Sequence, residues 1–221
     1  MGENRPYHHG DLRRALLDAA LQLIAERGIY DLTLREVARQ AGVSHNAPYH
    51  HFADKAELVA ALALEGFQTL EQAERAAYEQ AAGNPLERTL AISSAYIRFA
   101  LENPAIYSLM FRPELRKSSH NIQEWNGAVE SAADLTFQVL LDGISASQQA
   151  GLMRTDLSVY MLALTMWSTI HGLTTLLLDN MLTEKFDKFL GEEKAPPSQE
   201  MIEQLVTQVM YIVAQGLIAP Q

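Results

Sequence analysis

The segment TLREVARQAGVSHNAPYHHF, residues 33–52, restricts the fold more than any other part of the sequence. Apolar residues recur at the spacing of one buried helix face as far as Ala41, and Gly42 then ends the pattern. A second short run, rich in histidine, follows the glycine. Two short helices joined across a tight glycine turn are typical of a helix-turn-helix.

Local signals predict three helices in the N-terminal part of the chain. We expect a first helix at about 10–28, a supporting helix at about 34–41 and a recognition helix at about 45–52. Thr33 and Glu36 have the spacing of a capping box, and Ser44 is expected to cap the recognition helix.

The remaining sequence also predicts helices, and no strand pattern exceeds three residues. The expected caps are Asp54, Asn84, Asp156 and Ser198, the last two for an apolar helix to about 179 and for the final helix. We therefore expect an all-α protein. It comprises a small helix-turn-helix domain at 1–54 and a larger helical domain at 55–221.

Charge is distributed unevenly along the 221 residues, whose formal net charge is −10. Residues 1–60 contain seven basic and eight acidic residues, and five of the seven histidines precede residue 52. The rest of the chain is strongly acidic. The N-terminal part is therefore the one that permits a nucleic-acid surface.

The sequence predicts a soluble, cytoplasmic protein without a membrane partner. No signal-peptide pattern begins the chain, and the longest apolar run, 159–178, includes serine, threonine and histidine. We interpret that run as a buried helix. The absence of cysteine excludes disulfides and thiolate metal sites.

A short helix held across a glycine turn suits the DNA major groove, which admits one helix. Such a helix needs side chains that hydrogen-bond to base edges, with phosphate contacts around it. Lys55 and the first amides of the next helix are expected to form a phosphate-binding terminus. The candidate DNA-binding residues are Thr33, Arg35, Ser44, His45, Asn46, Tyr49, His50, His51 and Lys55.

Three close histidines also raise the alternative of a metal site. The spacing of His45, His50 and His51 spreads their side chains around a helix, and no carboxylate lies between them at helical spacing. We therefore expect neither a metal nor another cofactor.

The segment TLREVARQAGVSHNAPYHHFADKAEL resembles the DNA-binding domain of the TetR family of bacterial repressors, with coverage of roughly residues 10–60. The matching residues are Ala38, Ala41, Gly42, Val43, Ser44, Tyr49, His51, Phe52 and Lys55. Pro48 departs from the family pattern, and it affects the shape of the reading surface because proline removes an amide.

The resemblance implies roles for single residues. Tyr49 and Lys55 look like the family's phosphate contacts, and His51 resembles its recurrent histidine at the helix end. His45 and Asn46 would then be the specificity positions on a palindromic operator.

Trp167, His171 and Gly172 resemble the Trp-His-Gly signature of one C-terminal domain type in the same family. The resemblance implies that 1–54 is a DNA-binding domain and that 55–221 is a ligand-binding and dimerisation domain, which binds a small effector and forms a homodimer. Aromatic and methionine residues in the middle helices suggest a largely apolar effector, although the same residues also suit an ordinary core. The candidate pocket residues are Tyr96, Phe99, Tyr107, Met110, Phe111, Trp125, Phe137, Trp167 and His171.

Two late helices have broad apolar faces that would form a four-helix bundle across a two-fold axis. The alternative is that they pack entirely within one chain. The candidate interface residues are Leu162, Met166, Ile170, Leu173, Leu177, Ile202, Leu205, Val209, Ile212 and Val213.

These patterns favour a ligand-responsive transcriptional regulator, most simply a repressor released from operator DNA by a small effector. A helical interaction or scaffold protein is the main alternative. An enzyme is less favoured, because the sequence contains no nucleophile elbow, phosphate loop, zinc motif or dinucleotide fingerprint.

Overall fold

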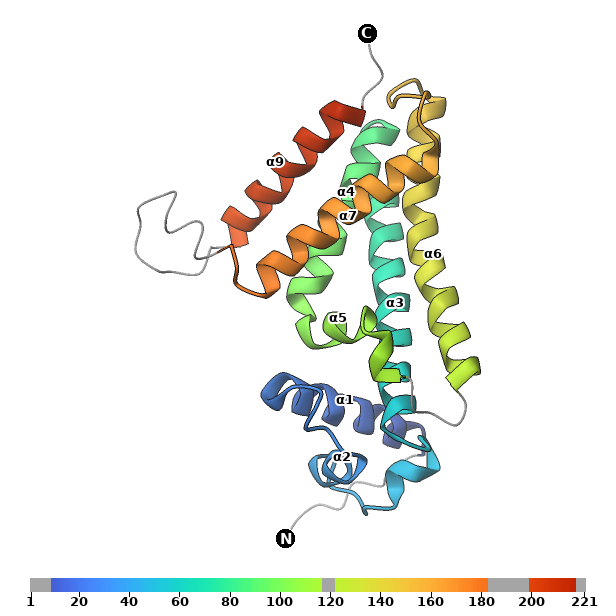
Figure 1. The fold of residues 1–221 in the computed structure, drawn as a ribbon, viewed down its shortest axis with the longest axis vertical. Helices are drawn as coiled ribbons and strands as arrows, with labels where there is room; N and C mark the ends of the chain where they lie inside the picture. The colour runs from blue at the N-terminus through green and yellow to red at the C-terminus, as the bar shows by residue number, and fades with distance from the viewer. Residues whose placement is uncertain (1–8, 117–121, 183–198, 218–221) are drawn as a thin grey trace, which may run out of the picture. The chain divides into compact units, whose positions relative to one another are not determined.

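The computed structural model describes residues 9–116, 122–182 and 199–217, and every regular element in these ranges is helical (Figure 1). The all-α expectation is therefore confirmed. The elements are α1 (His9–Arg27), α2 (Leu34–Gln40), η1 (Ala47–His50), α3 (Lys55–Gln80), α4 (Pro85–Glu102), α5 (Pro104–Met110), η2 (Pro113–Arg116), α6 (Ile122–Gln149), α7 (Val159–Leu178) and α9 (Gln199–Leu217).

The chain packs as two compact units. Unit 1 contains Met1–Phe67 and Pro104–Ser131, and unit 2 contains Gln68–Asn103 and Ala132–Gln221. Both α3 and α6 therefore contribute to each unit. These bounds describe packing, whereas the division into DNA-binding residues 1–54 and effector-binding residues 55–221 concerns function and remains a prediction.

The core of unit 1 fixes the helix-turn-helix against the start of α3. Helix α1 packs on α2 and α5, and α2 packs on η1. Leu16, Leu17, Val37, Phe52 and Leu58 are fully buried there. Each such side chain stabilises the fold by about 1.5–3 kcal/mol relative to an exposed position.

The turn after α2 depends on Gly42. Its φ is +69°, in the left-handed region where a side chain is strained. The Gly42 amide donates to the Arg39 carbonyl, and the Val43 amide donates to the Ala38 carbonyl at 3.0 Å. These bonds satisfy carbonyls at the end of α2 and redirect the chain into η1.

The recognition helix differs in type and length from the sequence expectation. A single 3-10 turn, Ala47–His50, stands where an α-helix at about 45–52 was predicted, and no side chain caps it. An α-helix would need the amide of Pro48 to reach the Ser44 carbonyl, and proline has no amide hydrogen. The Ala47 amide reaches that carbonyl instead, at 2.9 Å.

Unit 2 contains the hairpin of α4 with the second part of α3, the second part of α6, and α7 and α9. The Arg88 guanidinium fixes the hairpin register, because its Nε donates to the Tyr78 carbonyl at 2.8 Å while its carbon lies 4.4 Å from the Tyr78 ring centroid. The predicted Asn84 cap is confirmed, and it forms a full capping box with Glu87.

Helix α6 approaches this hairpin closely at Gly143. A Cβ placed there would lie 2.8 Å from Thr89 Oγ1 and 3.3 Å from the Tyr78 ring. One turn later on α6, the Ser147 and Thr89 hydroxyls are 3.2 Å apart and both are buried. Glycine is therefore needed here for close packing.

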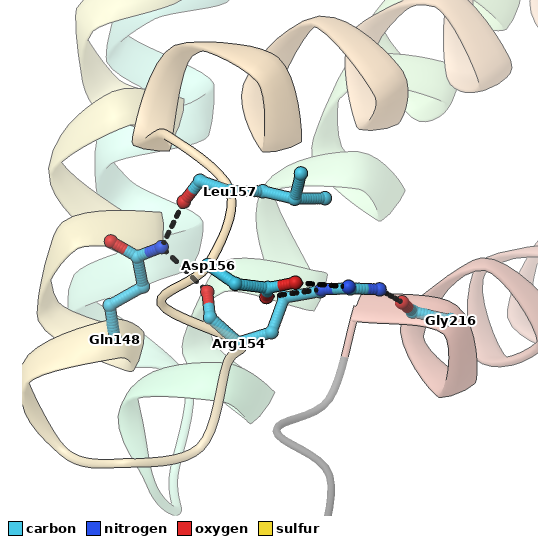
Figure 2. A network of polar contacts seen from close by, with 5 residues as sticks. All are labelled: Gln148, Arg154, Asp156, Leu157 and Gly216. Atoms are coloured by element: carbon cyan, nitrogen blue, oxygen red, sulfur yellow. Dashed lines mark hydrogen bonds and ion pairs between the residues drawn. The ribbon is translucent and has the colours of Figure 1, made fainter.

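In the loop between α6 and α7, the structure differs from the expectation that Asp156 caps the next helix (Figure 2). Asp156 pairs with Arg154, and the Ser158 hydroxyl caps α7 by accepting from the Met161 amide at 3.2 Å. Gln148 donates to the Arg154 and Leu157 carbonyls, which holds the loop on α6. The predicted Ser198 cap lies outside the described residues.

Helix α7 is long and apolar enough to cross a membrane by length and composition. Leu162, Met166 and Ile170 are nevertheless buried inside unit 2. A core helix of a soluble protein passes the same test, so the apolar run gives only weak evidence for a membrane span.

Candidate functional site

The segment around η1 exposes hydrogen-bonding side chains on one side and buries apolar side chains on the other. Pro48 and Phe52 are buried, and the Arg13 guanidinium lies 5.6 Å from the Phe52 ring centroid. Tyr49 is 50% exposed. The side chains of Ser44, His45, Asn46 and His50 are also exposed. Donors and acceptors of this kind suit base edges and phosphates.

His51 differs from its neighbours. It is half-buried, and its ring centroid lies 6.4 Å from that of Phe52. Its ring therefore helps to hold the end of η1 on the core, which leaves less of it for contact with DNA than His45 or His50 have.

The start of α2 is exposed beside η1. Thr33 and Arg35 are both exposed. The Thr33 hydroxyl accepts from the Glu36 amide at 3.2 Å and donates to the Glu36 carboxylate at 2.9 Å, which confirms the predicted Thr33 cap. Arg35 leaves its guanidinium directed at solvent, where it suits a phosphate.

The Lys55 side chain forms hydrogen bonds within the protein. Its ammonium donates to the Ile29 carbonyl at 2.6 Å and to the Tyr30 carbonyl at 3.1 Å. Partial burial lowers the pKa of Lys55, opposed by the nearby Asp31 and Glu36 carboxylates. Sequence reasoning missed this role, since the two carbonyls lie more than twenty residues earlier. The expected phosphate contact remains a prediction.

The start of α3 has its own cap. Asp54 Oδ1 accepts from the Glu57 amide at 2.9 Å, as the sequence predicted, and Glu57 accepts from the Ala53 amide at 2.8 Å. No metal-binding cluster of histidine and carboxylate side chains occurs in the part of the chain that the structure describes.

The residues expected to line a pocket fall into two aromatic groups. In unit 2 the Tyr96 hydroxyl and His171 Nδ1 are 2.8 Å apart, and the rings of His171 and Trp167 are 5.4 Å apart. Phe137 meets Trp167 edge to face at 6.1 Å. Burial lowers the pKa of His171, so the imidazole is mainly neutral near neutral pH. Phe99 is buried on α4.

The second group lies in unit 1. Phe111 packs against Phe67 and Tyr107, at centroid distances of 5.4 Å and 5.1 Å. Met110 is buried and Trp125 is half-buried. Ring contacts of this kind are typical of a core. That all nine residues bind one effector remains a prediction.

A hollow that sequence reasoning missed lies between α4 and α9 in unit 2. Its volume is about 430 Å³, within the range of small-molecule sites. It is lined by Ser94, Ile97, Arg98, Leu101, Glu102, Ile202, Val206 and Thr207. Helical periodicity in α4 places Ser94, Arg98 and Glu102 on one face, which was the available signal.

The five α7 residues of the predicted interface are buried within the chain itself: Leu162, Met166, Ile170, Leu173 and Leu177. Their membership of an interface remains a prediction. The opposite face of α7 exposes Tyr160, Met161, Leu164 and Leu176.

The α9 part is more accessible. Ile202, Leu205, Val209 and Val213 are half-buried, and Ile212 is 70% exposed. Their membership of an interface remains a prediction.

Comparison with known families accounts for both halves of the chain. Residues 16–62 match the family described as bacterial regulatory proteins, tetR family. Residues 89–207 match the tetracyclin repressor-like C-terminal domain. The chain belongs to the TetR family. As a TetR-family member it is a transcriptional regulator that binds DNA through a helix-turn-helix.

Solved structures agree with this assignment. A protein of unknown function from Rhodococcus sp. RHA1 is 31% identical, with a TM-score of 0.77, and the match covers 97% of this chain and 99% of that chain. KstR2 of Mycobacterium tuberculosis, a ketosteroid transcriptional regulator, is 26% identical, with a TM-score of 0.62 and 95% of each chain covered.

A TetR-family transcription regulator from Marinobacter aquaeolei VT8 is 19% identical, with a TM-score of 0.64, and the match covers 96% of this chain and 97% of that chain. This similarity shows the TetR fold. The narrower Trp-His-Gly assignment of the C-terminal residues remains a prediction.

Proposed function

We propose that this TetR-family protein is a cytoplasmic, non-enzymatic repressor that binds a palindromic operator as a homodimer and leaves it when a small molecule binds unit 2. The observation that most supports operator binding is a row of exposed polar side chains at η1, next to the buried Pro48 and Phe52. The row consists of His45, Asn46, Tyr49 and His50. Such a row has no role in the core and matches the chemistry of the major groove.

The exposed faces of α7 and α9 support the dimer. Tyr160, Met161 and Leu164 on α7, together with Tyr211 and Ile212 on α9, are large apolar side chains left at the surface. Helices α7 and α9 pack against each other. Exposed apolar side chains on two helices that pack together are typical of a protein interface, and a two-fold axis would cover both copies at once.

Oligomeric state tests the dimer separately from DNA binding. Sedimentation is expected to give twice the 24.6-kDa chain mass. Leu164→Glu and Ile212→Glu should dissociate the dimer, because a charge in an apolar interface is costly. Leu135→Glu is the matched control, since Leu135 is 57% exposed on α6. Equal dissociation by all three variants would contradict the assigned faces.

Selection from random duplexes tests the operator proposal. The wild-type protein should enrich one palindromic sequence. The double variant His45→Ala with Asn46→Ala should enrich either no sequence or a different one. Gln138→Ala, an exposed change on α6 in unit 2, should return the wild-type sequence. If the wild-type protein enriches no sequence, the operator proposal is wrong.

A reporter gene behind the selected sequence tests the direction of regulation. Expression should fall when the protein is present, and the fall should require an intact palindrome. A rise in expression would show an activator.

A further inference from the structure

The groove between α4 and α9 has an apolar floor within a polar rim. Ile97 and Val206 are buried at its base, and Leu101 and Ile202 are half-buried on its walls. Its volume of about 430 Å³ suits a small organic molecule. Of the residues that line the groove, Ile202 alone also belongs to the predicted interface, and none belongs to the predicted DNA-binding set.

Two charged residues, Arg98 and Glu102, lie at the rim of the groove. Arg98 and Glu102 lie one turn apart on α4, the spacing at which a helical ion pair forms. Over the ranges that the structure describes, however, the ion pairs involve neither residue. The Arg98 guanidinium is thus available for a ligand.

Donors outnumber acceptors on the α4 side of the groove. Ser94 and Arg98 lie on consecutive turns, and both are exposed toward the hollow. Their hydroxyl and planar guanidinium together match the two oxygens of a carboxylate. Glu102 is the last residue of α4, so it stands at one end of the groove.

We propose that the α4–α9 groove is the effector site of this regulator and takes a small carboxylate with an apolar body. The carboxylate pairs with Arg98 and Ser94, and the apolar body covers Ile97, Leu101 and Val206. This inference rests on the proposed ligand-responsive function.

The groove also connects the ligand with the proposed dimer. Ile202 and Val206 face the groove, while Met201, Tyr211 and Ile212 of the same helix are exposed on its other side. A molecule wedged between α4 and α9 must therefore act on the helix that presents the dimer face. Ligand and DNA then change each other's affinity by the same factor.

Calorimetry with decanoate, 1-decanol and decylamine, each below its micelle concentration, tests the site without DNA. The three probes share one apolar body and differ in the head group. Decanoate is expected to bind about tenfold more tightly than decanol, since an exposed charge-assisted hydrogen bond contributes about 1.5 kcal/mol. Tightest binding by decylamine, equal binding by all three, or binding by none would overturn the proposal.

Variants place the binding site. Arg98→Gln should remove the preference for decanoate over decanol, whereas Glu102→Gln one turn away should keep it. Ser94→Trp should fill the groove and abolish binding of both probes. Circular dichroism and thermal unfolding check the fold, and Ser94→Trp changes an exposed residue. Binding that survives Ser94→Trp, or that is lost in Trp167→Phe alone, would place the ligand elsewhere and overturn the proposal.

A DNA measurement separates this inference from the function on which it rests. If decanoate binds as expected and yet leaves operator affinity unchanged, the effector role of the groove is overturned while the DNA-binding function stands. If the protein selects no operator but binds decanoate through Arg98, the proposed repressor function fails and the carboxylate site stands.

Discussion

The Lys55 ammonium donates to the Ile29 carbonyl oxygen over 2.6 Å and so ties the first residue of α3 to the loop between α1 and α2. A second bond, to the Tyr30 carbonyl, strengthens the same connection. The residue expected from the sequence to hold a phosphate therefore also holds the helix-turn-helix on α3.

Replacement of Lys55 separates these two roles. Lys55→Met should lower the free energy of unfolding by about 1–2 kcal/mol, because two charge-assisted bonds to partly buried carbonyls are lost. It should also weaken binding to every duplex. Thermal unfolding and anisotropy over a range of salt concentrations are the measurements.

The salt dependence distinguishes the explanations. Loss of a phosphate contact lowers the slope of log affinity against log salt by about one. Loss of the hydrogen bonds to the Ile29 and Tyr30 carbonyls alone lowers stability and leaves that slope unchanged. Lys55→Arg is the control, because it keeps the charge. An unchanged melting temperature in Lys55→Met would contradict the structural role.

Asn46 should contribute sequence preference. Its exposed amide has the geometry that pairs with adenine, and one good base contact discriminates by about 1–3 kcal/mol. Asn46→Ala should relax the preference at one position in each half-site. Tyr49→Phe is the paired control and should weaken binding to all duplexes equally. A selection that returns the wild-type sequence with Asn46→Ala would remove this residue from base reading.

Close packing at Gly143 can be tested on a single helix. Gly143→Ala should destabilise the protein by about 1–3 kcal/mol, since the new methyl would overlap Thr89 Oγ1. Gly127, also on α6, has open space around its Cβ position. Gly127→Ala should therefore stabilise the protein by about 0.5–1 kcal/mol through helix propensity. Denaturant unfolding of both variants gives the comparison, and equal effects would contradict the packing.

Glu74 makes stability depend on pH. It is 4% exposed on α3, and one of its carboxylate oxygens is buried without a hydrogen-bond partner. Burial, together with the nearby Glu71, raises the pKa of Glu74 well above its usual value of 4.5. The folded protein therefore holds a proton that the unfolded chain releases, and stability falls as pH rises from that value to the folded pKa.

Glu74→Gln should remove this loss. Its melting temperature should exceed that of the wild-type protein near about pH 8, and the difference should vanish near about pH 4, where the carboxyl is protonated in both states. Melting curves at a series of pH values provide the test. A difference that grows toward low pH would reverse the sign and contradict the assignment.

Local signals were enough for most of the fold. Gly42 and the Asn84 cap act on their immediate neighbours, so the helix ends that they set were predictable from the sequence. The 3-10 form of η1 was harder to predict, because the effect of Pro48 depends on where the helix begins. Only in an α-helix that begins directly after Ser44 would the missing Pro48 amide leave the Ser44 carbonyl without its partner. The bond from Lys55 to Ile29 joins residues that are distant in sequence, and no local pattern indicates it.

The apolar faces of the late helices show the same limit. Periodicity correctly grouped Leu162, Met166 and Ile170 on one side of α7, but it does not say whether that side meets the same chain or another. The groove at Arg98 was missed because two helices far apart in sequence form it.

The most direct test of the central claim is a titration of the selected palindromic duplex and of a matched single half-site, followed by anisotropy at increasing salt. We predict two chains per palindrome, much weaker binding to the half-site, and affinity that falls steeply with salt. The His45→Ala, Asn46→Ala double variant should lose discrimination between these duplexes. Equal affinity of the wild-type protein for the palindrome, the half-site and unrelated DNA would contradict the proposed operator binding.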